Sequence, residues 1–248
     1  RGAAPSSRIG AYIALMKLRV VELLLVTTVP TMVLAEGGWP SIQLMAITLI
    51  GGTLAAGGAN AINMYIDRDI DKLMVRTQNR PLVTGALTPR AAMIFAIALE
   101  IVAFLVLWAG ANLLAAVLAV SATLFYVFVY SLWLKRTSKQ NIVIGGAAGA
   151  MPVLVGWAAV TNSLGWAPVV LFVVIFLWTP PHFWALAIRH ADDYKAAGVP
   201  MMPVVVSLER TIRSMTTYAV LLTLSTLVLV PVADLGWVYG ITAMVFGV

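Results

Sequence analysis

The sequence predicts an all-α fold: a polytopic bundle of transmembrane helices. Of its 248 residues, 61% are hydrophobic and only 10% are charged, and the mean hydropathy is +0.96. A water-soluble domain cannot bury that much apolar surface, whereas a lipid bilayer covers it. Long apolar runs alternate with short polar segments, as expected of a chain that crosses a membrane several times.

Eight apolar segments account for most of the chain. We expect residues 1–10 to be a disordered tail and not a signal peptide, because no small-residue cleavage site follows the first apolar run. An eighth segment starts near Val238 and reaches the end of the sequence after about half the length a crossing needs, so we expect a truncated chain. The seven segments long enough to span a membrane are Tyr12–Ala35 (kinked at Pro30), Ile42–Tyr65, Ala91–Trp108, Leu113–Trp133, Ile142–Val160, Pro168–Ile188 and Met215–Val232.

The charged residues predict the orientation of the bundle. When the loops are counted alternately, all 16 Lys and Arg residues fall on one side, and the opposite loops contain only Glu36 and Asp234. By the positive-inside rule, the N-terminus and the basic loops face the cytoplasm, or its mitochondrial equivalent, from an inner (plasma) membrane. Because the basic residues follow topology and form no nucleic-acid footprint, we exclude nucleic acid as a partner.

The polar stretch from Asn60 to Leu82, NAINMYIDRDIDKLMVRTQNRPL, holds the strongest candidate site. Asn63, Asp67 and Asp71 are four residues apart, so a continuing helix places all three on one face, while Asp69 points elsewhere. Two carboxylates at that spacing repel unless a cation lies between them. Oxygen ligands with an open side suit Mg²⁺, which completes its shell with water and substrate phosphate.

Basic residues accompany these carboxylates. Arg76, Thr77 and Arg80 follow by roughly one to three helical turns and can supply forked donors to phosphate oxygens. Arg68 and Lys72 are further candidate donors. The simpler alternative is a solvated loop whose mixed charges neutralise one another. A cluster this dense, in a chain with so few charges, favours a site.

A second polar segment covers residues 178–206 and falls on the same predicted side of the membrane. Asp192 and Asp193 can converge with the first cluster on a shared pair of cations, with a diphosphate between them. The alternative is an interfacial acidic pair beside Arg189 and Lys195. His182 and His190 are eight residues apart, nearly on one face of an uninterrupted helix.

The motif Asn63-x-x-x-Asp67-x-x-x-Asp71, followed by RTQNRPL at residues 76–82, resembles the first aspartate motif of the UbiA-type intramembrane prenyltransferases. Within that family, Thr179–Pro203 and the segment KLRVVELLLVTTVPTM resemble the branch that farnesylates protoheme IX, the heme O synthases. The resemblance covers essentially the whole chain. It implies a single membrane prenyltransferase domain over residues 1–248, in a fold of about nine spans whose last span and part of the eighth are missing here.

The resemblance also implies a reaction. Farnesyl diphosphate would bind through Mg²⁺ and ionise to an allylic cation, a protoheme vinyl group would attack the cation, and water would complete the product. Asp67 and Asp71 would be the Mg²⁺ ligands, with Asn63 in support. The diphosphate donors would be Arg76 and Arg80, to which we add the candidates Arg68, Lys72 and Lys195.

One departure from the family pattern concerns the second motif. Many relatives that act on quinone precursors carry two aspartates four residues apart, where this chain has His190 and Tyr194 with Asp193 between them. We therefore expect Asp193, and then Asp192, at a second cation. His182, His190 and Tyr194 are candidate contacts to heme, although a structural, hydrogen-bonded histidine is the alternative for His182.

Three other functions are compatible with parts of the pattern. The same chemistry on an aromatic acid, a quinone precursor or a chlorophyll-like ring is the nearest alternative. A transporter would also place charges among broken spans, but it predicts internal repeats and polar groups at mid-span. A purely structural subunit leaves the spacing of the first motif unexplained. Glu22 and Glu100 lie in or near spans, where carboxylates are costly and often functional, and neither has an expected partner.

Overall fold

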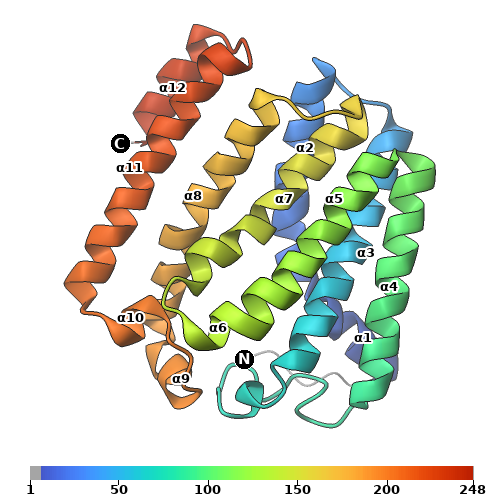
Figure 1. Cartoon of the computed structure of the whole chain (residues 1–248), viewed down its shortest axis with the longest axis vertical. Helices are drawn as coiled ribbons and strands as arrows, with labels where there is room; N and C mark the ends of the chain where they lie inside the picture. Colours follow the sequence, from blue (N-terminus) through green and yellow to red (C-terminus); the bar gives the residue numbers. More distant parts are fainter. Residues whose placement is uncertain (1–6, 248) are drawn as a thin grey trace.

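The computed structural model describes residues 7–247, and every regular element in that range is a helix (Figure 1). The all-α prediction is therefore confirmed. Residues 1–6 of the expected tail lie outside the described range, as does residue 248. The tail prediction was wrong for residues 8–10, because α1 (Arg8–Met16) begins at Arg8, where the Ser7 hydroxyl caps the helix by accepting from Gly10 N at 3.0 Å.

Within residues 7–247, seven helical stretches are long and apolar enough to cross a membrane. The fourth combines three elements: α5 (Leu113–Leu124), η2 (Phe125–Leu134) and α6 (Lys135–Thr137). The other six are α2 (Leu18–Glu36), α3 (Ile42–Ile66), α4 (Pro89–Gly110), α7 (Asn141–Thr161), α8 (Trp166–Arg189) and α11 (Leu208–Val232). Shorter elements are η1 (Ile70–Lys72), α9 (Ala191–Ala196), α10 (Met202–Val205) and α12 (Trp237–Gly247).

Polar residues at the helix starts set these boundaries. The side chains of Ser41, Thr88, Asn112 and Ser207 each accept a hydrogen bond from a backbone N–H in the first turn of α3, α4, α5 and α11. These bonds satisfy donors that a helix start otherwise leaves free. Because Ser207 caps α11, this helix starts at Leu208, seven residues before the predicted Met215.

The helices form a ring with an extension. Neighbours pack in the order α2, α3, α4, α5 and α7, and α7 closes the ring against α2; α8, α11 and α12 then continue outward from α7 (Figure 1). Small residues allow close approach inside the ring. Ala103, Ala115 and Ala158 belong to one fully buried cluster. Large apolar side chains such as Val26 and Ile94 face outward, where a bilayer covers them.

Two local features were not predicted. The first apolar segment is broken at Lys17, which adopts the left-handed conformation (φ 52°, ψ 54°) and separates α1 from α2. The second is η2, ten residues of π-helix, in which the Ser131 hydroxyl donates to the Tyr126 carbonyl five residues earlier (2.9 Å). π-Helical turns are rare and often lie at functional sites. Both features contact Asn63, near the end of α3.

Candidate active site

The first motif occupies the end of α3. The N–H of Asp67 donates to the Asn63 carbonyl at 2.9 Å, and that of Asp71 donates to the Asp67 carbonyl at 2.8 Å. The four-residue spacing of a helix thus continues beyond Ile66 as far as Asp71. All three side chains are buried, both aspartates completely, and Asn63 Nδ2 donates to Asp67 Oδ2 at 2.9 Å.

Three basic side chains surround the motif. Lys135 Nζ pairs with Asp67 Oδ2, and Arg80 Nη1 pairs with Asp71 Oδ2 at 2.6 Å. Lys17 Nζ donates to Asn63 Oδ1 at 2.8 Å. These groups offset the repulsion between the two carboxylates, which the spacing alone leaves uncompensated.

Lys17 joins the site through its unusual backbone. A non-glycine residue in the left-handed region is strained, and such strain is often found at functional sites. Burial lowers the pKa of the Lys17 ammonium well below its ordinary value, and Arg80 and Lys135 act in the same direction, while Asp67 and Asp71 oppose them. The amine thus lies within electrostatic range of every charged group in the motif.

The remaining carboxylate oxygens suit a metal ion. Asp67 Oδ1 and Asp71 Oδ1 are buried and have no hydrogen-bond partner in the described part of the chain; Arg136 Nη2 is 4.0 Å from the former. Buried acceptors are rarely left unpaired. Two carboxylate oxygens with an open side fit Mg²⁺ that also binds substrate phosphate. Asn63 Oδ1 is occupied by Lys17, so as placed the amide oxygen is not open to a metal.

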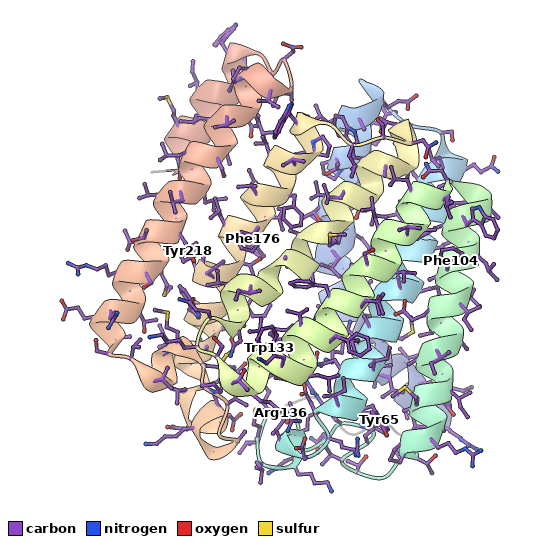
Figure 2. All side chains as sticks on the ribbon, in the orientation of Figure 1. Tyr65, Phe104, Trp133, Arg136, Phe176 and Tyr218 are labelled. Atoms are coloured by element: carbon purple, nitrogen blue, oxygen red, sulfur yellow. The ribbon has the colours of Figure 1, made fainter. Side chains whose placement is uncertain are left out.

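Asp69 points away from the motif, as its spacing predicts. Its carboxylate forms a two-pronged pair with Arg136, with both N···O distances 2.7 Å, and this hydrogen-bonded partner lowers the Asp69 pKa to about 2. Arg136 Nη2 also donates to the Ile66 carbonyl at 3.1 Å. Figure 2 shows Arg136 at the same end of the bundle as Tyr65. Arg136 therefore ties α6 to the end of α3.

The structure brings Asp193 to the first motif, but through backbone groups. Its two carboxylate oxygens accept from the N–H groups of Val75 and Arg76 at 3.0 and 3.2 Å. Arg76 Nη2 donates to the Tyr194 hydroxyl at 3.4 Å, and the Thr77 hydroxyl donates to the Asp71 carbonyl at 2.7 Å. α9 therefore holds the loop that follows η1.

The other predicted site residues are not assembled in the same way. Arg68 lies over the Tyr65 ring, 4.4 Å from its centre. In the described range, no group of three or more His, Cys, Asp or Glu side chains is arranged to hold a metal. The second cation therefore stays a prediction. The predicted site residues Lys72, Asp192 and Lys195 are exposed.

The histidines do not share a helix face. α8 ends at Arg189, and His190 is its C-cap, so the uninterrupted helix that would align the two histidines is not present. His182 stacks on Trp178 with ring centres 4.2 Å apart and meets Phe183 edge-on. Both histidines are half-buried, and their proposed contact with heme stays a prediction.

The sequence profile of the UbiA prenyltransferase family matches residues 24–248. The chain belongs to the UbiA prenyltransferase family. It is 58% identical over 247 residues to a protoheme IX farnesyltransferase of Parafrankia sp. (strain EAN1pec), covering 100% of this chain and 79% of that one. The protein of the same name from Streptomyces avermitilis is 51% identical over 248 residues, covering 100% and 81%. The chain is thus an intramembrane prenyltransferase.

Solved UbiA structures share the fold. A UbiA homolog from Archaeoglobus fulgidus bound to GPP and Mg²⁺ superimposes with a TM-score of 0.73 at 20% identity, over 96% of this chain and 86% of that one. The apo structure of a UbiA homolog from Aeropyrum pernix K1 gives a TM-score of 0.75 at 18% identity, covering 92% and 84%. At these identities the likeness concerns the fold alone.

Sequence reasoning missed Lys17, Ser131 and Lys135 in this UbiA-family site. The Ser131 hydroxyl accepts from Asn63 Nδ2 at 3.0 Å, one turn before Lys135 meets Asp67. The two lysines were read only as topology signals. The sequence does contain one signal for Ser131 and Lys135. They are four residues apart, as Asn63 and Asp67 are, so two adjacent helices can bring Ser131 to Asn63 and Lys135 to Asp67.

Proposed function

We propose that this UbiA-family enzyme transfers the farnesyl group of farnesyl diphosphate to a vinyl group of protoheme IX, producing heme O. The choice of acceptor is supported by relatives 51–58% identical to this chain, which are named protoheme IX farnesyltransferases. The site assignment is carried by one observation: within residues 7–247, the buried oxygens Asp67 Oδ1 and Asp71 Oδ1 have no hydrogen-bond partner, while Lys135 and Arg80 pair with the other oxygen of each carboxylate.

The diphosphate would bind across this pair of carboxylates. Asp67 and Asp71 would hold Mg²⁺, which when bound supplies positive charge to the leaving diphosphate. Lys17, Arg80 and Lys135 already point their nitrogens at the motif, so they can donate to phosphate oxygens without a large rearrangement. Preorganised charges and donors that meet developing negative charge usually make the largest single contribution to catalysis.

The bond between the first farnesyl carbon and the diphosphate oxygen breaks, and both electrons leave with the diphosphate. The vinyl group of protoheme attacks the allylic cation to form a new carbon–carbon bond. Water adds to the resulting heme cation and releases one proton. The stacked rings of Tyr126 and Tyr130, centres 5.3 Å apart on η2, offer π faces that stabilise positive charge near the motif.

We further propose that residues 1–248 act as one prenyltransferase domain, with the N-terminus and the motif facing the cytoplasm. The positive-inside distribution supports this orientation. Prenyl transfer to an aromatic acid, a quinone precursor or a chlorophyll-like ring is the alternative, since the first motif serves any of these acceptors equally well.

The decisive experiment supplies the purified protein in membranes with protoheme, farnesyl diphosphate and Mg²⁺, followed by mass analysis of the extracted heme. We expect a product heavier than protoheme by one farnesyl group and one hydroxyl group derived from water. Parallel reactions contain 4-hydroxybenzoate or a chlorophyllide in place of protoheme. A farnesylated product from either of these, and none from protoheme, would contradict the proposed acceptor.

A further inference from the structure

Asn141, the first residue of α7, has an unusual side chain. It is completely buried, yet neither its amide nitrogen nor its amide oxygen has a hydrogen-bond partner in the described part of the chain. Most buried polar atoms are paired, and leaving both ends of a buried amide unpaired is costly. The mechanism proposed above uses no part of this residue.

The first turn of α7 is only partly paired in the described part of the chain: the Asn141 N–H donates to the Ser138 carbonyl at 3.2 Å, and the next two backbone N–H groups are left over. Its N-cap, Gln140, makes no side-chain bond to the helix. The backbone N–H groups of Ile142 and Val143 donate to no protein group within residues 7–247. α7 has 21 residues, so its N-terminus carries the full positive end of a helix dipole. A helix start of this kind favours an anion.

The position of Asn141 is set by its neighbours on α7. Asn141 and Gly145 are four apart and share a helix face. Gly145 lies so close to the Tyr130 ring that an added methyl group would collide with it. Tyr130 precedes Ser131, whose hydroxyl accepts a hydrogen bond from Asn63 Nδ2 at 3.0 Å. This face of α7 therefore turns toward the side of the site formed by η2.

A second contact places α7 near the other half of the motif. Ile142 is part of the buried cluster that contains Ile70 and Met74, and Ile70 immediately precedes Asp71 in η1. The start of α7 thus lies between η2 and η1. η2 is followed directly by Lys135, which pairs with Asp67, and η1 contains Asp71. The unpaired oxygens of Asp67 and Asp71 and the unpaired amide of Asn141 lie at the same end of the bundle.

We propose that Asn141 and the first turn of α7 form an additional contact for the metal-bound diphosphate. The inference rests on the proposed function, because it assumes a diphosphate at the first motif. Asn141 Nδ2 would donate to a phosphate oxygen of the bound diphosphate, and Oδ1 would accept a hydrogen bond from water at the site. A neutral amide suits this place because it meets both demands, whereas another lysine would only donate and would repel the metal.

Binding of inorganic pyrophosphate with Mg²⁺, measured by calorimetry on the detergent-solubilised protein, tests the contact without catalysis. The variant Asn141→Leu keeps the approximate shape and removes both polar ends. Loss of a hydrogen bond to a charged group should weaken pyrophosphate binding about tenfold or more. Removal of an unpaired buried amide should leave the ligand-free protein as stable as before or more stable.

The control variant Val153→Ala alters a buried apolar side chain of the same helix, about three turns away from the proposed contact. It should lower the melting temperature and leave pyrophosphate affinity unchanged. If Asn141→Leu does not fold, Asn141→Ala gives the same test with a smaller side chain. Wild-type affinity in the folded Asn141 variant would overturn the inference, as would a variant that loses protoporphyrin binding while it keeps pyrophosphate binding.

The failure of the proposed function would look different. In that case the wild-type protein itself would not bind pyrophosphate with Mg²⁺, and both proposals would fall together. Wild-type binding that is equal in the variant would remove only the contact at Asn141. Weakened binding in the variant, with a ligand-free melting temperature at or above that of the wild type, supports it.

Discussion

Replacing Lys135 by Met tests whether the lysine neutralises Asp67. The carboxylate is completely buried, and the lysine side chain is only 12% exposed, so the pair is shielded from water. Removing one partner of a buried ion pair costs about 3–5 kcal/mol, because the other charge stays buried alone. Arg136, 4.0 Å from Asp67 Oδ1, can take over part of the interaction. We therefore expect a loss at or below the lower limit of this range, about 2–3 kcal/mol.

The measurement is a double-mutant cycle on unfolding in mixed micelles, with the variants Lys135→Met, Asp67→Asn and the two combined. The neutral double variant should recover much of the lost stability, giving a coupling energy of about 1–3 kcal/mol. Prenyl transfer should not recover, since both groups are needed at the diphosphate. Strictly additive effects on stability would refute the pairing. The exposed residue Lys139 gives a matched control, because Lys139→Met should leave stability unchanged.

Three further outcomes are expected. Asp71→Asn should insert and fold but lose prenyl transfer, since the metal needs an anionic ligand; normal turnover at saturating Mg²⁺ would exclude that role. A topology reporter fused after Lys139 should read cytoplasmic and one after Gly165 external, and the reverse pattern would contradict the orientation. His190→Ala should weaken heme binding, seen as a change in the heme absorption spectrum, with nearly unchanged affinity for farnesyl diphosphate; the opposite pattern would reject a heme contact.

Hydropathy and cap residues predict most of the fold, because both act locally. α3 illustrates this: the predicted segment Ile42–Tyr65 differs by one residue from the observed Ile42–Ile66. The first motif was also accessible, since its spacing by itself aligns Asn63, Asp67 and Asp71. These features depend on residues close together in the chain.

Long-range contacts account for what was missed. The helix breaks at Lys17, within a segment that hydropathy predicts to be one span. The hydrogen bond that Lys17 donates there goes to Asn63, 46 residues later in the chain. Likewise, the π-helical turns of η2 bring Ser131 and Lys135 to α3, and nothing in that apolar sequence distinguishes them from an α-helix. The end of α8 at Arg189 separated the two histidines for a similar reason, because no helix-breaking residue marks it.

The balance of charge in the site has a consequence for the order of binding. Arg80 and Lys135 match the two carboxylates, and Lys17 and Arg136 lie close by, so the ligand-free site carries no net negative charge. A free divalent cation therefore meets little attraction, whereas a diphosphate brings the negative charge that the cation needs. Metal and diphosphate are expected to enter as one complex and, after transfer, to leave as one.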